Sequence, residues 1–152
     1  MRSVYRVFAY IIALEVVIQA AAIAFGVFGL AKWVDDGATL TKATMENENT
    51  TFTGLVGLMV HGMNGMMVIP LLALVFLVIS FFAKVPGGAK WAGLVFLAVV
   101  VQVLLGMFAH ELVGLGALHG ANALLIFGLA VMAGKRVGTV TRPVAEREAA
   151  RV

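Results

Sequence analysis

The sequence predicts an all-α integral membrane protein, a four-helix bundle made of two repeated two-helix hairpins with both termini inside. The first observation is composition: of 152 residues, 62% are hydrophobic and 12% are charged. Soluble domains average about 45–50% apolar and about 25% charged residues. The second is the presence of four apolar runs, each long enough to cross a bilayer as a helix of about 20 residues. The third is the position of the charges, which lie at the ends of these runs.

The four runs predict one transmembrane domain, residues 1–134, followed by a basic tail, residues 135–152. The first run continues past any small-residue cleavage site, so we interpret it as a helix rather than a signal peptide. A longer outer loop is expected to follow the first helix, and short links join the others. The helices are expected at residues 4–31, 55–83, 91–109 and 113–134, with the outer loop at 32–54.

The distribution of Lys and Arg predicts the orientation. Basic residues lie before the first helix, in the link at residues 84–90 and in the tail, whereas the loop at 32–54 is acidic. The positive-inside rule therefore places both termini in the cytoplasm, and we expect the membrane to be a bacterial inner membrane. The net charge of +3 is explained by this topology, so no nucleic-acid partner is expected.

Several kinds of chemistry have no sequence basis. The chain has no cysteine, which excludes a disulfide framework, a thiolate metal site and a thiol nucleophile. It also lacks a phosphate-binding glycine loop, a catalytic triad and a zinc-protease motif. Whether the protein is an enzyme stays open.

A short polar motif occurs twice and indicates duplication. The second helix holds His61-Gly62-Met63-Asn64, and the fourth holds His119-Gly120-Ala121-Asn122. The helix before each motif carries a glutamine, Gln19 in the first half and Gln102 in the second. This order predicts that a two-helix hairpin is repeated, with both copies in the same orientation.

The repeat places His61 and His119 at similar depths, each roughly 9 Å below the outer surface at ~1.5 Å per residue. A polar side chain in lipid is expensive, so it normally faces the bundle interior and serves a site. The structural alternative is packing through interhelical hydrogen bonds, worth ~0.6 kcal/mol on average. Gly62 and Gly120 leave room for a planar ligand. Asn64 and Asn122 are expected to orient an imidazole or to bond a cofactor edge.

Two cofactors suit this pattern. Histidine is a common axial ligand of haem iron, and ligands from facing helices converge in a four-helix bundle. We therefore predict haem b with His61 and His119 as axial ligands. The alternative metal is copper, because thioethers suit Cu(I) and Met63, among other methionines, lies near His61. Met59, Met63, Met66 and Met67 are expected to scatter around the helix, so that not all of them face one site.

Three further residues complete the candidate site or its surroundings. His110 lies at the outer end of the third helix and is predicted to be a secondary cofactor-binding residue. Glu15 shares a helix face with Gln19 deeper in the membrane and is a candidate proton relay. Pro70 is expected to kink the second helix, because it lacks an N–H and crowds the carbonyl of Met66.

The second half resembles a known family. Its motifs are Gln102-Val103-Leu104-Leu105-Gly106 and His119-Gly120-Ala121-Asn122. They resemble those of small four-helix bacterial membrane proteins and of one four-helix half of haem A synthase. The matches carry over to Gln102, Gly106 and His119, and more loosely to His61. That enzyme has a glutamate before its helix-two histidine, and often paired cysteines, which this chain lacks. The resemblance therefore implies a haem-binding scaffold more than haem-modifying chemistry.

The function predicted from the sequence is b-type haem binding for electron transfer, in or beside a respiratory or quinone pathway. The expected partners are the lipid bilayer, a quinone or a respiratory complex, and a further copy of the chain. Two alternatives stay open: a cofactor-free structural or accessory subunit, and a copper-handling membrane protein.

Overall fold

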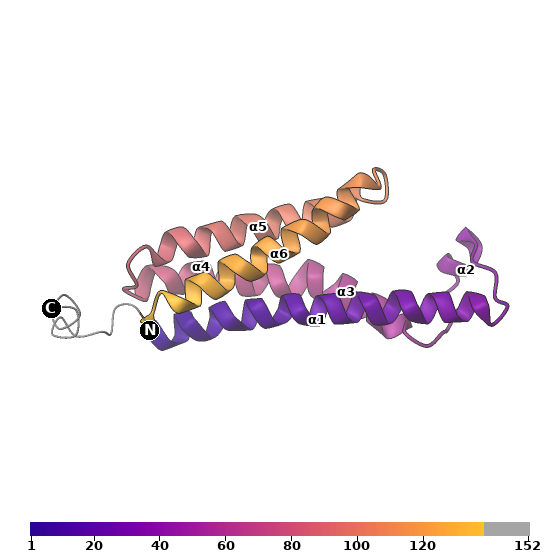
Figure 1. The fold of residues 1–152 in the computed structure, drawn as a ribbon, viewed down its shortest axis with the longest axis horizontal. Helices are drawn as coiled ribbons and strands as arrows, with labels where there is room; N and C mark the ends of the chain where they lie inside the picture. The colour runs from indigo at the N-terminus through magenta and orange to yellow at the C-terminus, as the bar shows by residue number, and fades with distance from the viewer. Residues whose placement is uncertain (139–152) are drawn as a thin grey trace, which may run out of the picture. The chain divides into compact units, whose positions relative to one another are not determined.

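The computed structural model describes residues 1–138, and every regular element in this range is a helix (Figure 1). Four helices are long and apolar enough to cross a membrane. The prediction of an all-α protein with four helices of transmembrane length and composition is therefore confirmed. The basic tail beyond residue 138, with Arg142, Arg147 and Arg151, lies outside the described residues.

The helices lie close to the predicted positions, with two differences. The first helix is longer than predicted at both ends, and the outer loop contains a short helix, α2. Thr41 caps α2 by accepting a hydrogen bond from the Thr44 backbone N–H at 3.1 Å, which satisfies a donor that the helix leaves without a partner. The elements are α1 (Arg2–Asp35), α2 (Lys42–Glu46), α3 (Leu55–Met63), η1 (Asn64–Val68), α4 (Ile69–Phe82), α5 (Gly88–Phe108) and α6 (Gly114–Lys135).

The second span is interrupted by a π-helical segment, η1, which ends at Val68, two residues before Pro70. Proline has no N–H and its ring crowds the carbonyl four residues earlier, which here belongs to Met66. Widening the preceding turn is one way for a helix to accommodate such a residue. The irregularity predicted at Pro70 therefore takes the form of a π-helical turn, a feature often found at functional sites.

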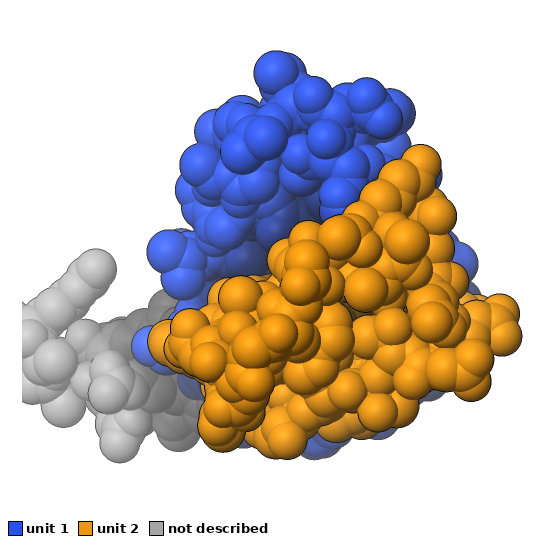
Figure 2. Space-filling view, turned by 90° about the vertical axis from the view of Figure 1, so that its right-hand side faces the viewer, with its two compact units in different colours: residues 1–16, 69–152 blue, residues 17–68 orange. Residues whose placement is uncertain are grey.

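The chain divides into two compact units (Figure 2). Unit 1 contains Met1–Val16 and the chain from Ile69 onward, and thus the start of α1 together with α4, α5 and α6. Unit 2 contains Val17–Val68, and thus the rest of α1 together with α2, α3 and η1.

Unit 1 holds the hydrophobic core. Its largest fully buried side chains are Tyr5, Phe76, Ile12, Val95 and Val99. The Tyr5 and Phe76 rings lie 4.7 Å apart between centroids in a tilted arrangement, which is a favourable aromatic geometry. The Tyr5 hydroxyl donates to the Gly88 carbonyl at 3.1 Å, so α1 is tied to the start of α5 by both apolar packing and a buried hydrogen bond.

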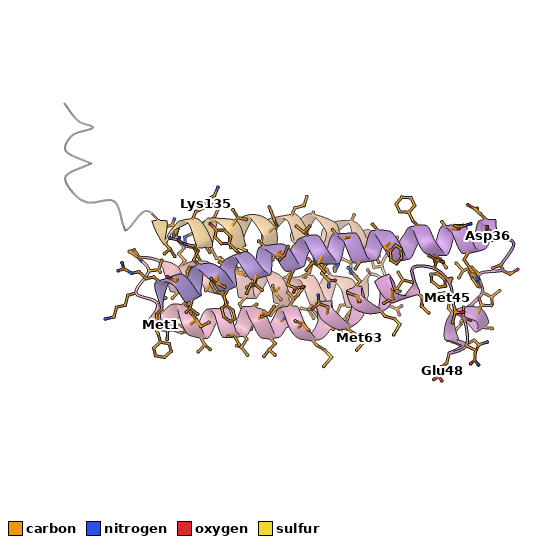
Figure 3. The ribbon with its side chains drawn as sticks, turned by 90° about the horizontal axis from the view of Figure 1, so that it is seen from below. Met1, Asp36, Met45, Glu48, Met63 and Lys135 are labelled. Atoms are coloured by element: carbon orange, nitrogen blue, oxygen red, sulfur yellow. The ribbon has the colours of Figure 1, made fainter. Side chains whose placement is uncertain are left out.

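One end of unit 1 gathers basic residues. The start of α1 meets the start of α5 through the Tyr5–Gly88 bond, and the Arg136 guanidinium lies 4.7 Å from the centre of the Trp91 ring. Met1 and Lys135 lie at this same end (Figure 3). The N-terminus, the α4–α5 link and the end of α6 are therefore neighbours.

Unit 2 is packed in a different way. Its buried residues are three glycines, Gly26, Gly54 and Gly57. A Cβ added at Gly57 would lie 2.9 Å from the backbone nitrogen of Gly26, and one at Gly54 would lie 2.6 Å from the Phe25 carbonyl oxygen. The backbones of α1 and α3 thus approach too closely for side chains, as small residues allow in membrane helices.

The buried Tyr5 hydroxyl generates a prediction. Tyr5→Phe removes the donor and leaves the Gly88 carbonyl buried without it, so we expect a loss of about 0.5–1.5 kcal/mol of stability. Thermal unfolding in detergent, followed by circular dichroism, measures the change. Tyr10→Phe is the matched control, because Tyr10 is 41% exposed. A loss as large for Tyr10→Phe as for Tyr5→Phe would contradict the role of this bond.

Candidate functional site

In unit 2, His61 bonds to the neighbouring helix. Its Nδ1 atom lies 3.2 Å from the backbone carbonyl oxygen of Gln19. The glycine contacts between α1 and α3 make this possible, because they bring the imidazole of one helix within reach of the backbone of the other. His61 is partly buried.

This bond determines which ring nitrogen of His61 carries the hydrogen. A carbonyl oxygen only accepts hydrogen bonds, so the Nδ1 atom of His61 must carry the hydrogen. In the neutral imidazole the lone pair then resides on Nε2. This is the arrangement of most metal-ligating histidines, in which one nitrogen donates to a carbonyl or carboxylate and the other bears the ligand lone pair.

In unit 1, His119 makes the same contact. Its Nδ1 atom lies 3.0 Å from the backbone carbonyl oxygen of Gln102, so its lone pair also resides on Nε2. A Cβ added at Gly106 would lie 3.1 Å from Cε1 and 3.2 Å from Nδ1 of the ring. Gly106, one turn beyond Gln102 on α5, therefore makes the space in which the His119 ring lies.

Asn122 strengthens the same α5–α6 contact. Its side-chain amide donates to the Gln102 Oε1 atom at 2.8 Å and to the Ala98 carbonyl at 2.9 Å. Gln102 thus accepts from α6 twice, through its backbone to His119 and through its side chain to Asn122. Two of the predicted site residues, His119 and Asn122, are brought together with a third, Gln102.

Gln19 differs from Gln102 in one respect. Among the described residues, its Nε2 atom is buried and has no hydrogen-bond partner. A buried amide donor left unbonded costs about 1–3 kcal/mol. Its Oε1 atom faces Gly65, where an added Cβ would lie 3.4 Å away. The surroundings of His61 therefore offer a hydrogen-bond donor to a group with an acceptor oxygen.

The other predicted residues take up more varied positions. Asn64 begins the π-helical turn, and Glu15 lies in unit 1; both are partly buried and engaged in interactions. An added Cβ at Gly62 or Gly120 would meet nothing within 4 Å, so both glycines border open space. His110 is exposed in the turn between α5 and α6.

One expectation about the methionines was wrong. Met59, Met63, Met66 and Met67 line a common groove on α3 and η1 instead of scattering around the helix. Their successive spacings of four, three and one residues place all four on one face of a helix. Among residues 1–138, no three His, Cys, Asp or Glu side chains gather as a metal centre. Thioether ligands, and the one or two ligands that a haem takes, are not of this kind.

The sequence could not identify the acceptors of this site. His61 and His119 bond to backbone carbonyls, which every residue carries, so Gln19 and Gln102 take part through an atom that residue type does not specify. The Ala98 carbonyl was missed for the same reason. The one available signal was the position of the glutamines relative to the histidine motifs.

Comparison with protein-family models, curated proteins and solved structures finds no match to this chain.

The space at Gly106 generates a prediction. Gly106→Ala places a methyl group against the His119 ring, so we expect the bond to the Gln102 carbonyl to lengthen or break. Ring ¹⁵N chemical shifts of His119, assigned with a His119→Gln variant, report the tautomer. Gly120→Ala is the control, because its methyl group enters open space. Unchanged His119 shifts in Gly106→Ala would contradict the described geometry.

Proposed function

We propose that this protein is an integral membrane b-type haem protein that transfers electrons, with His61 and His119 as the axial ligands. The observation that supports this most is the matched pair of Nδ1–carbonyl bonds, at 3.2 Å for His61 and 3.0 Å for His119. Each bond directs the imidazole lone pair to Nε2 and holds the ring orientation, as ligand histidines require.

The residues present suit a haem. Ligation of haem iron by two imidazoles needs the lone pair of each ring on Nε2. In His61 and His119 the hydrogen of the neutral ring is on Nδ1, which leaves the lone pair on Nε2. The buried Nε2 atom of Gln19 is a donor for an acceptor oxygen. When bound, the haem supplies a one-electron redox centre.

The chain's own residues have distinct roles in this proposal. Gln19 and Gln102 hold the ligand rings through their carbonyls, and Asn122 fixes Gln102. His110, exposed at the α5–α6 turn, is proposed as a partner for a propionate or an entry-site residue. Glu15 is proposed as a proton relay, because a carboxyl within a span is costly when charged. A quinone or a respiratory complex is the proposed electron partner.

The same contacts support the proposed duplication. In each half, the histidine of an HGxN motif bonds to the backbone carbonyl of the glutamine on the preceding helix of that half. Gln19 thus corresponds to Gln102, and His61 to His119. In the second half Asn122 also bonds to Gln102, and in the first half Asn64 begins a π-helical turn.

A cofactor-free accessory subunit is the second candidate function. One observation favours it: the His–carbonyl bonds join neighbouring helices, which is what packing hydrogen bonds do in membrane proteins. In the haem protein, Nε2 of His61 and of His119 would bind the haem iron, whereas the accessory subunit has no haem. Absorption spectroscopy separates them.

The ligand assignment predicts spectra. Purified wild-type protein from haem-replete cells should show a low-spin Soret band and, after dithionite reduction, a sharp α band. His61→Ala and His119→Ala each remove an axial ligand, so the haem should be lost or become high-spin. His110→Ala and Glu15→Gln should keep the low-spin spectrum. Absence of haem from well-expressed wild-type protein would favour the accessory subunit.

The basic end of unit 1 supports a cytoplasmic position for both termini and for the α4–α5 link. Since the chain has no cysteine, single cysteines can report sidedness. Met45→Cys, in the outer loop, should react with a membrane-impermeant maleimide in intact cells. Ala89→Cys, at the α4–α5 link, should react only after the membrane is permeabilised. The reverse pattern would overturn this orientation.

A further inference from the structure

A shallow apolar groove runs along the second span in unit 2. It has a volume of about 370 Å³ and is lined by Leu58, Met59, Gly62, Met63, Met66 and Met67. Met63 lies on the side of this helix turned away from α1 (Figure 3), whereas His61 bonds toward α1. The groove is thus distinct from the His61 contact.

Helix geometry brings the four thioethers together. Residues 59, 63, 66 and 67 are spaced as one stripe of a helix, and the last two lie in the π-helical segment Asn64–Val68. A π-helix has more residues per turn than an α-helix, which keeps Met63 and Met67 close to the same line. Gly62 adds no side chain, so the floor of the groove stays open between them.

Core packing within unit 2 does not explain these methionines. Methionine commonly fills gaps in apolar cores, but the buried residues of unit 2 are three glycines. Met59, Met63, Met66 and Met67 are 53%, 62%, 58% and 66% exposed, so they do not fill the interior of unit 2. The chain has eight methionines, and half of them lie within residues 59–67.

We propose that this groove binds one Cu(I) ion through the thioethers of Met63 and Met67, with Met59 and Met66 as further ligands. Thioethers are soft, neutral donors that select Cu(I) over harder divalent ions. The chain has no cysteine, so methionine and histidine are its only soft ligands. The site lies about one to three turns along the span from the start of α3, at ~1.5 Å per residue, which is within reach of an ion entering from the outer loop.

Competition for Cu(I) tests the proposal. Full-length protein in detergent micelles is titrated against a chromophoric Cu(I) chelator under reducing, anaerobic conditions. Wild-type protein should take one equivalent. Met63→Leu combined with Met67→Leu keeps apolar volume and should weaken binding by more than about tenfold, since even outer-shell changes cost metal sites about 10- to 100-fold. An unchanged affinity would overturn the proposal.

A matched pair of methionines provides the control. Met107 and Met132 are 52% and 51% exposed on α5 and α6, so Met107→Leu with Met132→Leu should leave the affinity unchanged. X-ray absorption of the wild-type Cu(I) complex should show a sulfur-only first shell, a result that depends on no variant. Nitrogen ligation, or loss of binding in His61→Ala, would assign the copper to the histidines. The haem spectrum is a separate readout, so failure of one proposal leaves the other standing.

Discussion

An imidazole N–H inside a membrane span needs an acceptor, because lipid offers none and an unbonded polar group there is costly. In this protein both span histidines give that hydrogen to a backbone carbonyl of the preceding long helix. The bond requires the two backbones to lie close together. Glycines provide this at α1 and α3, and Gly106 makes the space for the second ring. The bond that joins the helices also leaves the lone pair of each neutral imidazole on Nε2.

The two units satisfy this requirement in different settings. In unit 1 the His119 contact accompanies a side-chain core that includes Ile126 and Val99, and Asn122 completes the hydrogen bonds of Gln102. In unit 2 the His61 contact accompanies glycine packing, a buried donor on Gln19 and a π-helical turn. Among the described residues, the buried side-chain donor without a hydrogen-bond partner, Nε2 of Gln19, therefore lies in unit 2.

Much of the fold could be predicted from the sequence because lipid restricts the choices. Apolar runs of sufficient length must be helices, so the four spans follow from composition and run length alone. The extension of α1 to Asp35 and the helix α2 could not be predicted, since both lie where the chain leaves the apolar runs. His61 and His119 were identified by their motif. Their carbonyl acceptors were not, because a carbonyl has no residue identity, and the common groove of the methionines was missed through an incorrect estimate of their helical phase.

The central claim is that both imidazoles bind iron through Nε2 while Nδ1 stays on a carbonyl. Pulsed electron–nuclear spectroscopy of the ferric protein, with histidine labelled by ¹⁵N at the ring, measures this directly. The account predicts strong couplings from two directly bound imidazole nitrogens, and a weakly coupled, protonated remote nitrogen in each ring. Coupling to a single imidazole, or to none, would contradict it.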